Sequence, residues 1–255
     1  MIRARRAPVK HFLSRAPVLY SAPVDRRFMK VYELLRNAHG PRRWWPVTPR
    51  GGTTPLYTGG PRSDLQRFEV AVGAILTQNT AWSNAARAIE NLNRLGAMSP
   101  GAIEGMDFQS LARAIRSAGY FNQKARRLRT IAAYFRENRK GTRESLLALN
   151  GVGPETADSI MLYAFSAPFF VVDAYTRRLF GRLALVDPSA PYEEIRDRFE
   201  RNLPRRAFIY KEYHALIVEH GKLVCRKAPF CEKCLLKRLC LMYLGRKEAN
   251  QGKDG

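Results

Sequence analysis

The chain has four cysteines, and all of them stand in one short segment near its end. They are Cys225, Cys231, Cys234 and Cys240. The first residues do not resemble a signal peptide, which would join a charged head to an apolar run, so we expect a reducing compartment and free thiols. Four free thiols in one short segment most economically bind a metal. This feature limits the C-terminal part of the fold to a loop closed around a ligand.

The spacing of these cysteines, C-x5-C-x2-C-x5-C, distinguishes between metals. Structural zinc usually takes two separated C-x2-4-C pairs that close a tetrahedron from opposite sides. Here a single C-x2-C is flanked by wider gaps on one continuous loop, which favours a cubane 4Fe-4S cluster. Zinc and incidental free cysteines remain alternatives. The same loop carries cations suited to a phosphate backbone: Arg226, Lys227, Lys233, Lys237 and Arg238.

The charge balance indicates the class of partner. The chain has 44 Lys+Arg against 22 Asp+Glu, a formal net charge of +22, which favours nucleic acid as the ligand. An anionic membrane is the alternative, but no apolar run approaches the ~20 residues of a spanning helix and no lipidation signal is present. With 255 residues and 45% hydrophobic content, the chain can bury one substantial core or two small ones.

Apolar residues recur at intervals of three and four along most of the chain, and no convincing strand is found. The pattern predicts helices over 28–38, 65–78, 81–95, 109–118, 122–138, 155–166, 174–184, 191–202 and 206–220. We therefore expect an all-α, two-lobed protein. We expect residues 1–26 to form a flexible basic arm and residues 65–185 to form a helical barrel lobe. Residues 27–64 and 186–243 should together form a second lobe, which carries the cysteine loop 225–240. Within the second lobe, 47–62 is rich in Pro, Gly and Thr and predicts an exposed loop.

Residues 142–166 predict a helix–hairpin–helix. Their centre reads LLALNGVGPETADSI, with Gly151 and Gly153 in the turn and Pro154 at the first position of the second helix. The glycines allow a tight turn and close approach of a DNA phosphate, which amides at the helix start would bind. We expect Gly151, Val152, Gly153 and Thr156 to contact DNA in this way, without reading bases. A simple corner between two helices is the alternative.

Asp173 follows the apolar run FFVV and precedes a helix that contains Arg177. At the start of that helix its carboxylate would face whatever the hairpin binds. A plain N-cap, which Asp favours by about 1 kcal/mol, is the alternative reading.

The order of hairpin, Val172-Asp173-x-x-x-Arg177 and cysteine loop resembles the helix–hairpin–helix DNA glycosylases, such as endonuclease III and adenine glycosylase, from about Val31 to Leu241. The arm and the 47–62 loop lie outside this resemblance. It implies an enzyme that flips a damaged base out of double-stranded DNA and cuts its N-glycosidic bond. In such enzymes the aspartate matching Asp173 stabilises the positive charge developing on the sugar and helps to activate water.

One position departs from endonuclease III. Members that also nick the strand have a lysine directly before the Thr-Ala of the hairpin's second helix, where this chain has Glu155. A carboxylate cannot form the Schiff base that the lyase step requires. The resemblance therefore implies a monofunctional glycosylase with weak or absent lyase activity, unless Lys124 or another lysine substitutes.

Three further segments are similar to 3-methyladenine DNA glycosylase III: Trp44-Trp45-Pro46, LTQNTAW at 76–82 and SAGYFNQKA at 117–125. This resemblance implies a base pocket with Trp44, Trp45, Pro46 and Trp82 as an aromatic slot and Glu155 beside the base. Alkylation at N3 or N7 makes a purine cationic, and stacking on indole faces can contribute ~1–2 kcal/mol for such a base. Core packing of these tryptophans is the alternative, and that family is not defined by a cysteine loop.

Gln78 and Asn79 stand where relatives insert a side chain into the gap left by the flipped base. Lys124 and Arg177 are expected to line the DNA channel. His214 and His220 receive no role. Excision of oxidised pyrimidines or mismatched bases, as by endonuclease III, and a non-catalytic damage-binding protein both remain alternatives. We expect a cytoplasmic, nucleoid-associated monomer.

Overall fold

The computed structural model describes residues 23–138 and 141–245. Within these ranges the chain is helical, and its β pairing is limited to one antiparallel bridge between Val47 and Leu56. The all-α prediction is therefore confirmed. Most of the expected basic arm, 1–22, lies outside the described residues. No helix in the described ranges is long and apolar enough to cross a membrane.

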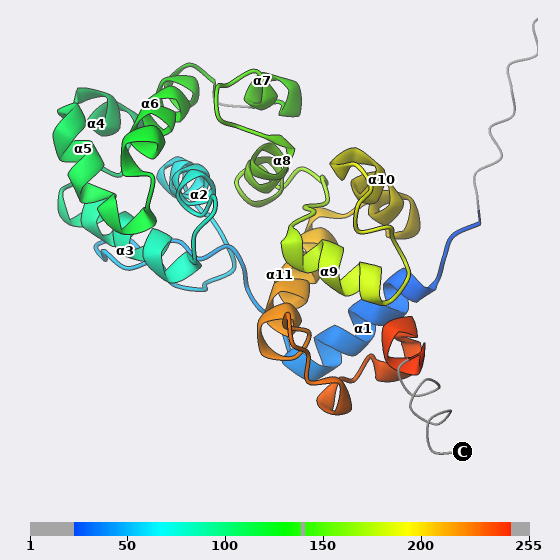
Figure 1. Ribbon diagram of the computed structural model, residues 1–255. Coiled ribbons are helices and arrows are strands. Elements are labelled where there is room, and N and C mark those ends of the chain that lie inside the picture. The colour runs from blue at the N-terminus through cyan, green and yellow to red at the C-terminus, as the bar shows by residue number, and fades with distance from the viewer. Residues whose placement is uncertain (1–22, 139–140, 246–255) are drawn as a thin grey trace, which may run out of the picture.

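One lobe is built around two long helices, α2 (Asp64–Leu76) and α6 (Phe121–Glu137), which pack against each other. Three further helices complete it: α3 (Trp82–Arg94), α4 (Pro100–Gly105) and α5 (Phe108–Ala114). Every residue of α2 from 68 to 76 is buried, so this helix lies in the interior of the protein, beside α6 (Figure 1).

The second lobe combines the two ends of the described chain. It contains α1 (Arg27–His39), α9 (Ala174–Arg182), α10 (Tyr192–Asn202) and α11 (Ala207–Leu223). Helix α11 packs against both α1 and α9 (Figure 1). The lobe boundary expected at 185–186 stays a proposal, but it would separate α9 from the helix against which it packs. The core here is aromatic: Phe28, Phe170, Phe180, Phe199 and Tyr213 are all fully buried.

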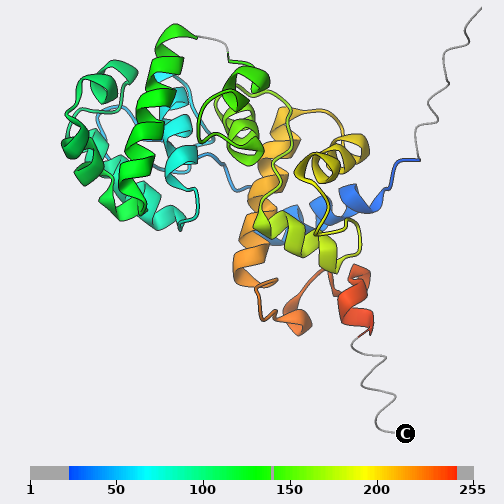
Figure 2. The same ribbon diagram turned by 45° about the horizontal axis from the view of Figure 1, so that its top comes forward.

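The hairpin lies between the lobes (Figure 2). Its helices are α7 (Arg143–Leu147) and α8 (Pro154–Tyr163), and α8 packs against both α2 and α11. Arg143 on α7 pairs with Asp158 Oδ1 within the hairpin and with Glu193 Oε1 on α10, at 2.6 Å each. Because the Asp158 side chain is wholly buried, its charge needs this partner. The ion pairs therefore hold the hairpin in a fixed position on the second lobe.

Helix starts follow the capping residues in the sequence. Ser63, Ser99, Asp107, Thr142 and Asp173 each accept a hydrogen bond from a backbone N–H of the turn that follows. Ser99 and the proline after it start α4, a helix of six residues that the apolar pattern did not predict because it buries only one side chain.

Candidate functional site

Asp173 is the N-cap of α9, where the hairpin and the second lobe meet. Its Oδ1 accepts from the Thr176 N–H at 2.7 Å and from the Thr176 hydroxyl at 2.9 Å. Its Oδ2 lies 3.5 Å from His214 Nε2. Burial would raise the pKa of this carboxyl, but the contacts with His214 and Thr176 outweigh it and lower that pKa. Asp173 is therefore both a helix cap and a stable anion.

His214, on α11, holds the other side of this carboxylate. The ring is only 5% exposed, and its Nδ1 lies 2.8 Å from the Tyr163 hydroxyl. If Nδ1 accepts from Tyr163, Nε2 carries the proton that faces Asp173, which is the arrangement an anion favours. Neither His214 nor Tyr163 was predicted from the sequence to act at the site. Their separation of 51 residues leaves no local pattern, and only helical packing brings them together.

Glu155, the second residue of α8, is the other acidic side chain of the site. It is exposed, yet its surroundings change its acidity. Loss of water and then the charge of Asp173 raise its pKa to about 7, although His214 and Arg177 act in the opposite direction. The pKa values of the two carboxyls are thus shifted apart, as in sites where one acid stays ionised and its neighbour exchanges a proton.

Trp44 forms an aromatic wall next to this pair. Its ring, half-buried, lies 5.8 Å from that of His214 and 6.4 Å from that of Tyr163 between centroids. The Lys222 ammonium lies 6.0 Å from the Trp44 ring centre, so a cation already reaches this face. Trp44 is therefore adjacent to the histidine that holds Asp173.

The remaining residues of the expected slot stand behind and beside Trp44. Trp45 is 6% exposed, and its ring lies 5.1 Å from that of Tyr163 and 5.5 Å from that of Trp82. Pro46 is buried, whereas Trp82, at the start of α3, is half-buried. Trp45 and Pro46 thus support the wall, and Trp44 and Trp82 present the more accessible aromatic surface.

The hairpin turn is held by Gln78. Its Nε2 donates to Gly151 O at 3.0 Å and to Thr156 Oγ1 at 2.9 Å, and its Oε1 accepts from Arg127. Asn79 is exposed, with a positive φ of 54°. Val152 is buried and Gly153 is exposed at the N-cap of α8. The amide of Gln78, which was expected to enter the gap left by the flipped base, thus bonds to the hairpin turn and to Arg127 in this structure.

Two cations expected in the DNA channel are held by the protein itself. Lys124 is 2% exposed, and its Nζ donates to Leu76 O and Ala118 O at 2.8 Å each. Burial lowers its pKa to about 8. The expectation that Lys124 contacts DNA is wrong, because its ammonium caps carbonyls in the interior. Arg177 donates to Pro188 O at 3.0 Å and Ala190 O at 2.7 Å, so it braces a loop.

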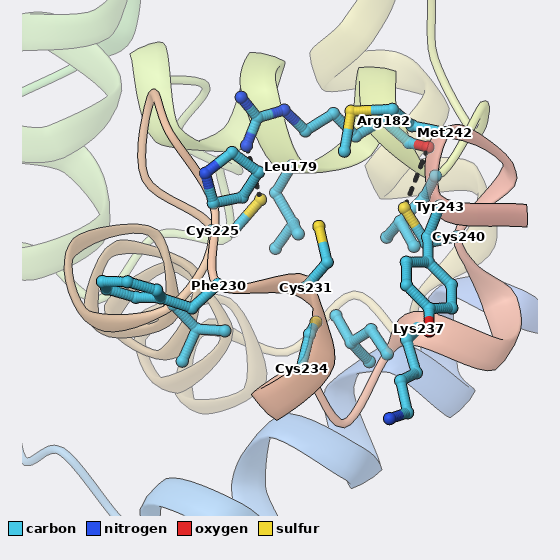
Figure 3. Close-up of a pocket in the computed structure, with 14 residues that line it drawn as sticks. Leu179, Arg182, Cys225, Phe230, Cys231, Cys234, Lys237, Cys240, Met242 and Tyr243 are labelled. Carbon is cyan, nitrogen blue, oxygen red and sulfur yellow. Dashed lines mark hydrogen bonds between the residues drawn. The ribbon is translucent and has the colours of Figure 1, made fainter. Parts of the chain in front are cut away.

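The four cysteines line one apolar cavity between α9 and the C-terminal loop, and their sulfurs face a shared space (Figure 3). This space measures about 330 Å³, part of it open to solvent. Arg182 Nη1 lies 3.3 Å from Cys225 Sγ, and His220 Nε2 lies 3.4 Å from Cys234 Sγ. Burial raises the pKa of the Cys234 thiol to about 11. In the described ranges, no three side chains among His, Cys, Asp and Glu are placed to hold a single metal ion.

Comparisons with known proteins show which family the chain resembles. The family model described as "HhH-GPD superfamily base excision DNA repair protein" matches residues 72–205. A Methanocaldococcus jannaschii protein, provisionally named a DNA repair glycosylase, is 44% identical over 225 residues, covering 83% of this chain and 94% of its own length. Endonuclease III of Sulfolobus acidocaldarius is 30% identical over 186 residues, covering 69% and 82%.

Two solved structures are also similar. A non-covalent endonuclease III–DNA complex aligns with a TM-score of 0.72 at 19% identity and covers 89% of this chain and 100% of its own. Helicobacter pylori 3-methyladenine DNA glycosylase bound to 1,N6-ethenoadenine aligns with a TM-score of 0.62 at 25% identity and covers 76% and 97%.

Proposed function

The chain belongs to the HhH-GPD superfamily of base excision DNA repair proteins and is a DNA glycosylase, and from that premise we propose a monofunctional enzyme that excises alkylated purines such as 3-methyladenine. The observation that carries this proposal is the contact of Trp44 with His214, which holds Asp173. The electron-rich indole thus adjoins the histidine beside the carboxylate that would act at the sugar.

Asp173 supplies the charge that the reaction needs. As the bond from C1′ to the base nitrogen breaks, its electron pair leaves with the base and positive charge develops on the sugar. An anion fixed by Thr176 and His214 stabilises that charge without having to reorganise. Water then adds to C1′ and loses a proton, which leaves an abasic sugar. A methylated purine cation departs as a neutral base, so its departure needs no proton from the protein.

Trp44 would select for the charge of the base. A purine cation stacked on an indole gains about 1–2 kcal/mol over a neutral base when water is excluded. The Lys222 ammonium lies 6.0 Å from the centre of the same ring, which supports a preference of this face for cations. The structural likeness to a 3-methyladenine glycosylase supports this substrate class.

Glu155 supports the absence of a lyase step. It takes the place of the lysine that would attack the sugar, and a carboxylate has no amine with which to form a Schiff base. Lys124 cannot substitute from the interior, where two carbonyls hold its ammonium. The competing function is activity of the endonuclease III type, the name that several relatives carry, for which we expect oxidised pyrimidines as substrates.

We further propose that the four cysteines hold a 4Fe-4S cluster. Their sulfurs line a single apolar cavity, and Arg182 and His220 supply N–H groups next to two of them. Base hydrolysis transfers no electrons, so the bound cluster would serve to join the C-terminal loop to α9 and α11.

The substrate would be double-stranded DNA with one damaged base, bound by a monomer.

The test is a panel of duplexes that carry 3-methyladenine, 7-methylguanine, uracil, thymine glycol or a G·T mismatch, with the released base identified by chromatography. We expect methylpurine release by the wild type. Trp44→Ala should slow it by about tenfold, the equivalent of 1–2 kcal/mol, and should affect any neutral base less. Phe208→Ala removes an exposed aromatic ring at the start of α11 as a control and should change little. Preferential release of thymine glycol would contradict the substrate assignment.

A further inference from the structure

His220 is a buried histidine outside the excision site, and both of its ring nitrogens have partners. Its side chain is 0% exposed on α11. Nδ1 lies 3.2 Å from His39 Nε2, and Nε2 lies 3.4 Å from Cys234 Sγ. A continuous chain of contacts thus runs from the end of α1 through α11 to one of the four cysteines.

The chemistry of a metal-bound sulfur determines which ring nitrogens of His220 and His39 carry protons. A cysteine that ligates iron is a thiolate, which accepts hydrogen bonds and cannot donate them. His220 must then carry its proton on Nε2 to meet Cys234. A neutral imidazole has only one N–H, so its Nδ1 is an acceptor, and His39 must carry a proton on its own Nε2.

We infer that His220 is a positioning residue for the cluster, donating from Nε2 to the Cys234 thiolate, and that His39 holds it in the tautomer that can do so. This inference rests on the proposed cluster. Partners of this kind orient metal ligands and tune the metal, and a hydrogen bond to a ligating sulfur stabilises the reduced, more negative state. His220 would therefore raise the reduction potential of the cluster and slow its loss.

The series of contacts from Cys234 through His220 ends at His39, which lies close in sequence to the residues expected in the base pocket. His39 is the last residue of α1, and its carbonyl accepts from Arg42 Nη1 at 3.3 Å. Arg42 in turn pairs with Glu219 at 3.0 Å, one residue before His220 on α11. Trp44 follows two residues after Arg42. His39 therefore contacts both His220 and Arg42, and Arg42 belongs to the segment that leads into the aromatic wall.

The test compares variants of the full-length protein with the cluster loaded. His220→Leu removes the donor, His220→Gln places an amide N–H near the position of Nε2, and His39→Leu removes the group that fixes the tautomer. Leu216→Ala, a buried change on the same helix outside the cysteine cavity, controls for destabilised packing. The readouts are iron and sulfide content, the reduction potential, and the rate at which a chelator removes iron.

We expect His220→Leu to shift the potential to more negative values and to speed iron loss by roughly tenfold. His39→Leu should shift the potential in the same direction by less, His220→Gln should stay near the wild type, and Leu216→Ala should lower thermal stability without moving the potential. An unchanged potential in His220→Leu, or a glutamine variant that behaves like leucine, would overturn the inference. A wild-type protein that takes up no iron and sulfide would instead overturn the proposed cluster, and the inference with it.

Discussion

Asp173 combines two roles that its position in the sequence left as alternatives. It caps α9 through Thr176 and is also held as an anion beside His214. Both roles use the same carboxylate, because a helix start supplies N–H donors that stabilise negative charge. The N-cap reading is therefore compatible with the catalytic role proposed for Asp173.

Replacement of Asp173 by asparagine should separate these roles. Asparagine caps a helix about as well as aspartate, so the free energy of unfolding should change by no more than about 1 kcal/mol. Loss of the charge should slow base release by about 100- to 1000-fold. Single-turnover excision and urea unfolding measure the two effects. An Asp173→Asn variant that releases the base as fast as the wild type would show that this carboxylate does not carry the reaction.

Glu155 should make stability depend on pH in a defined direction. Its pKa is about 7 in the folded chain against an ordinary value of 4.5, so between these pH values the folded chain retains a proton that the unfolded chain releases. The free energy of unfolding must therefore fall as pH rises through this window.

In Glu155→Gln this dependence should be reduced. Between pH 5 and pH 8 the wild type should lose stability relative to the variant, by about 1 kcal/mol or less because solvent screens this exposed carboxylate. Urea titrations at both pH values test it. If the wild type instead became more stable relative to the variant as pH rises, the pKa of Glu155 would not be raised in the folded chain.

Side chains with a local signal could be assigned from the sequence, and those that depend on distant contacts could not. The cysteine spacing and the aspartate before a helix are local patterns. His214 and Tyr163 were missed because their partners lie on other helices. Lys124 was misassigned because its charge suggests solvent, whereas two carbonyls in the interior hold its ammonium.

The hairpin turn depends on Gly151. Its φ is +85°, and a Cβ there would come within 2.3 Å of Arg127 Nε, on the side chain that also holds Gln78. Gly153 has an ordinary negative φ and open space around it, which makes it a matched control.

Gly151→Ala should lower stability by about 1–2 kcal/mol, which for a chain of this size is a fall in Tm of roughly 3–6 °C, and should weaken DNA binding. Gly153→Ala should lower Tm by less, since only a helix cap is altered. Thermal unfolding of both variants measures the difference. Equal losses would mean that the left-handed conformation at Gly151 does not set the turn.

Helix existence could be predicted from apolar periodicity, but short helices and packing partners could not. Most of the long helices lie within a few residues of their expected bounds, since each buries one face. α4 has one buried residue and left no pattern. The position of α9 against α11 depends on side chains such as Arg178, which donates to Cys225 O at 2.8 Å and Gly221 O at 2.9 Å.

The charge of the whole chain should dominate its affinity for undamaged DNA. A net charge of +22 implies many phosphate contacts, each of which releases a counterion. Between 50 and 200 mM salt we expect the Kd for undamaged duplex to rise by about 10³-fold. Asp173→Asn should retain this slope, because it alters the site and not the basic surface. Fluorescence anisotropy across a salt series tests it, and a flat dependence would contradict electrostatic binding.

The two lobes and the hairpin between them bring Asp173, Glu155 and Trp44 to one place from separate parts of the chain. That convergence, rather than any single motif, supports excision of a cationic base without strand cleavage. The most direct measurement uses a duplex with one 7-methylguanine, in which released base and strand breaks are counted in the same reaction, with borohydride added to trap any Schiff base. We predict base release in excess of strand breaks, breaks that appear only after alkali, and no trapped complex. Breaks that keep pace with base release without alkali, together with a trapped complex, would contradict the account.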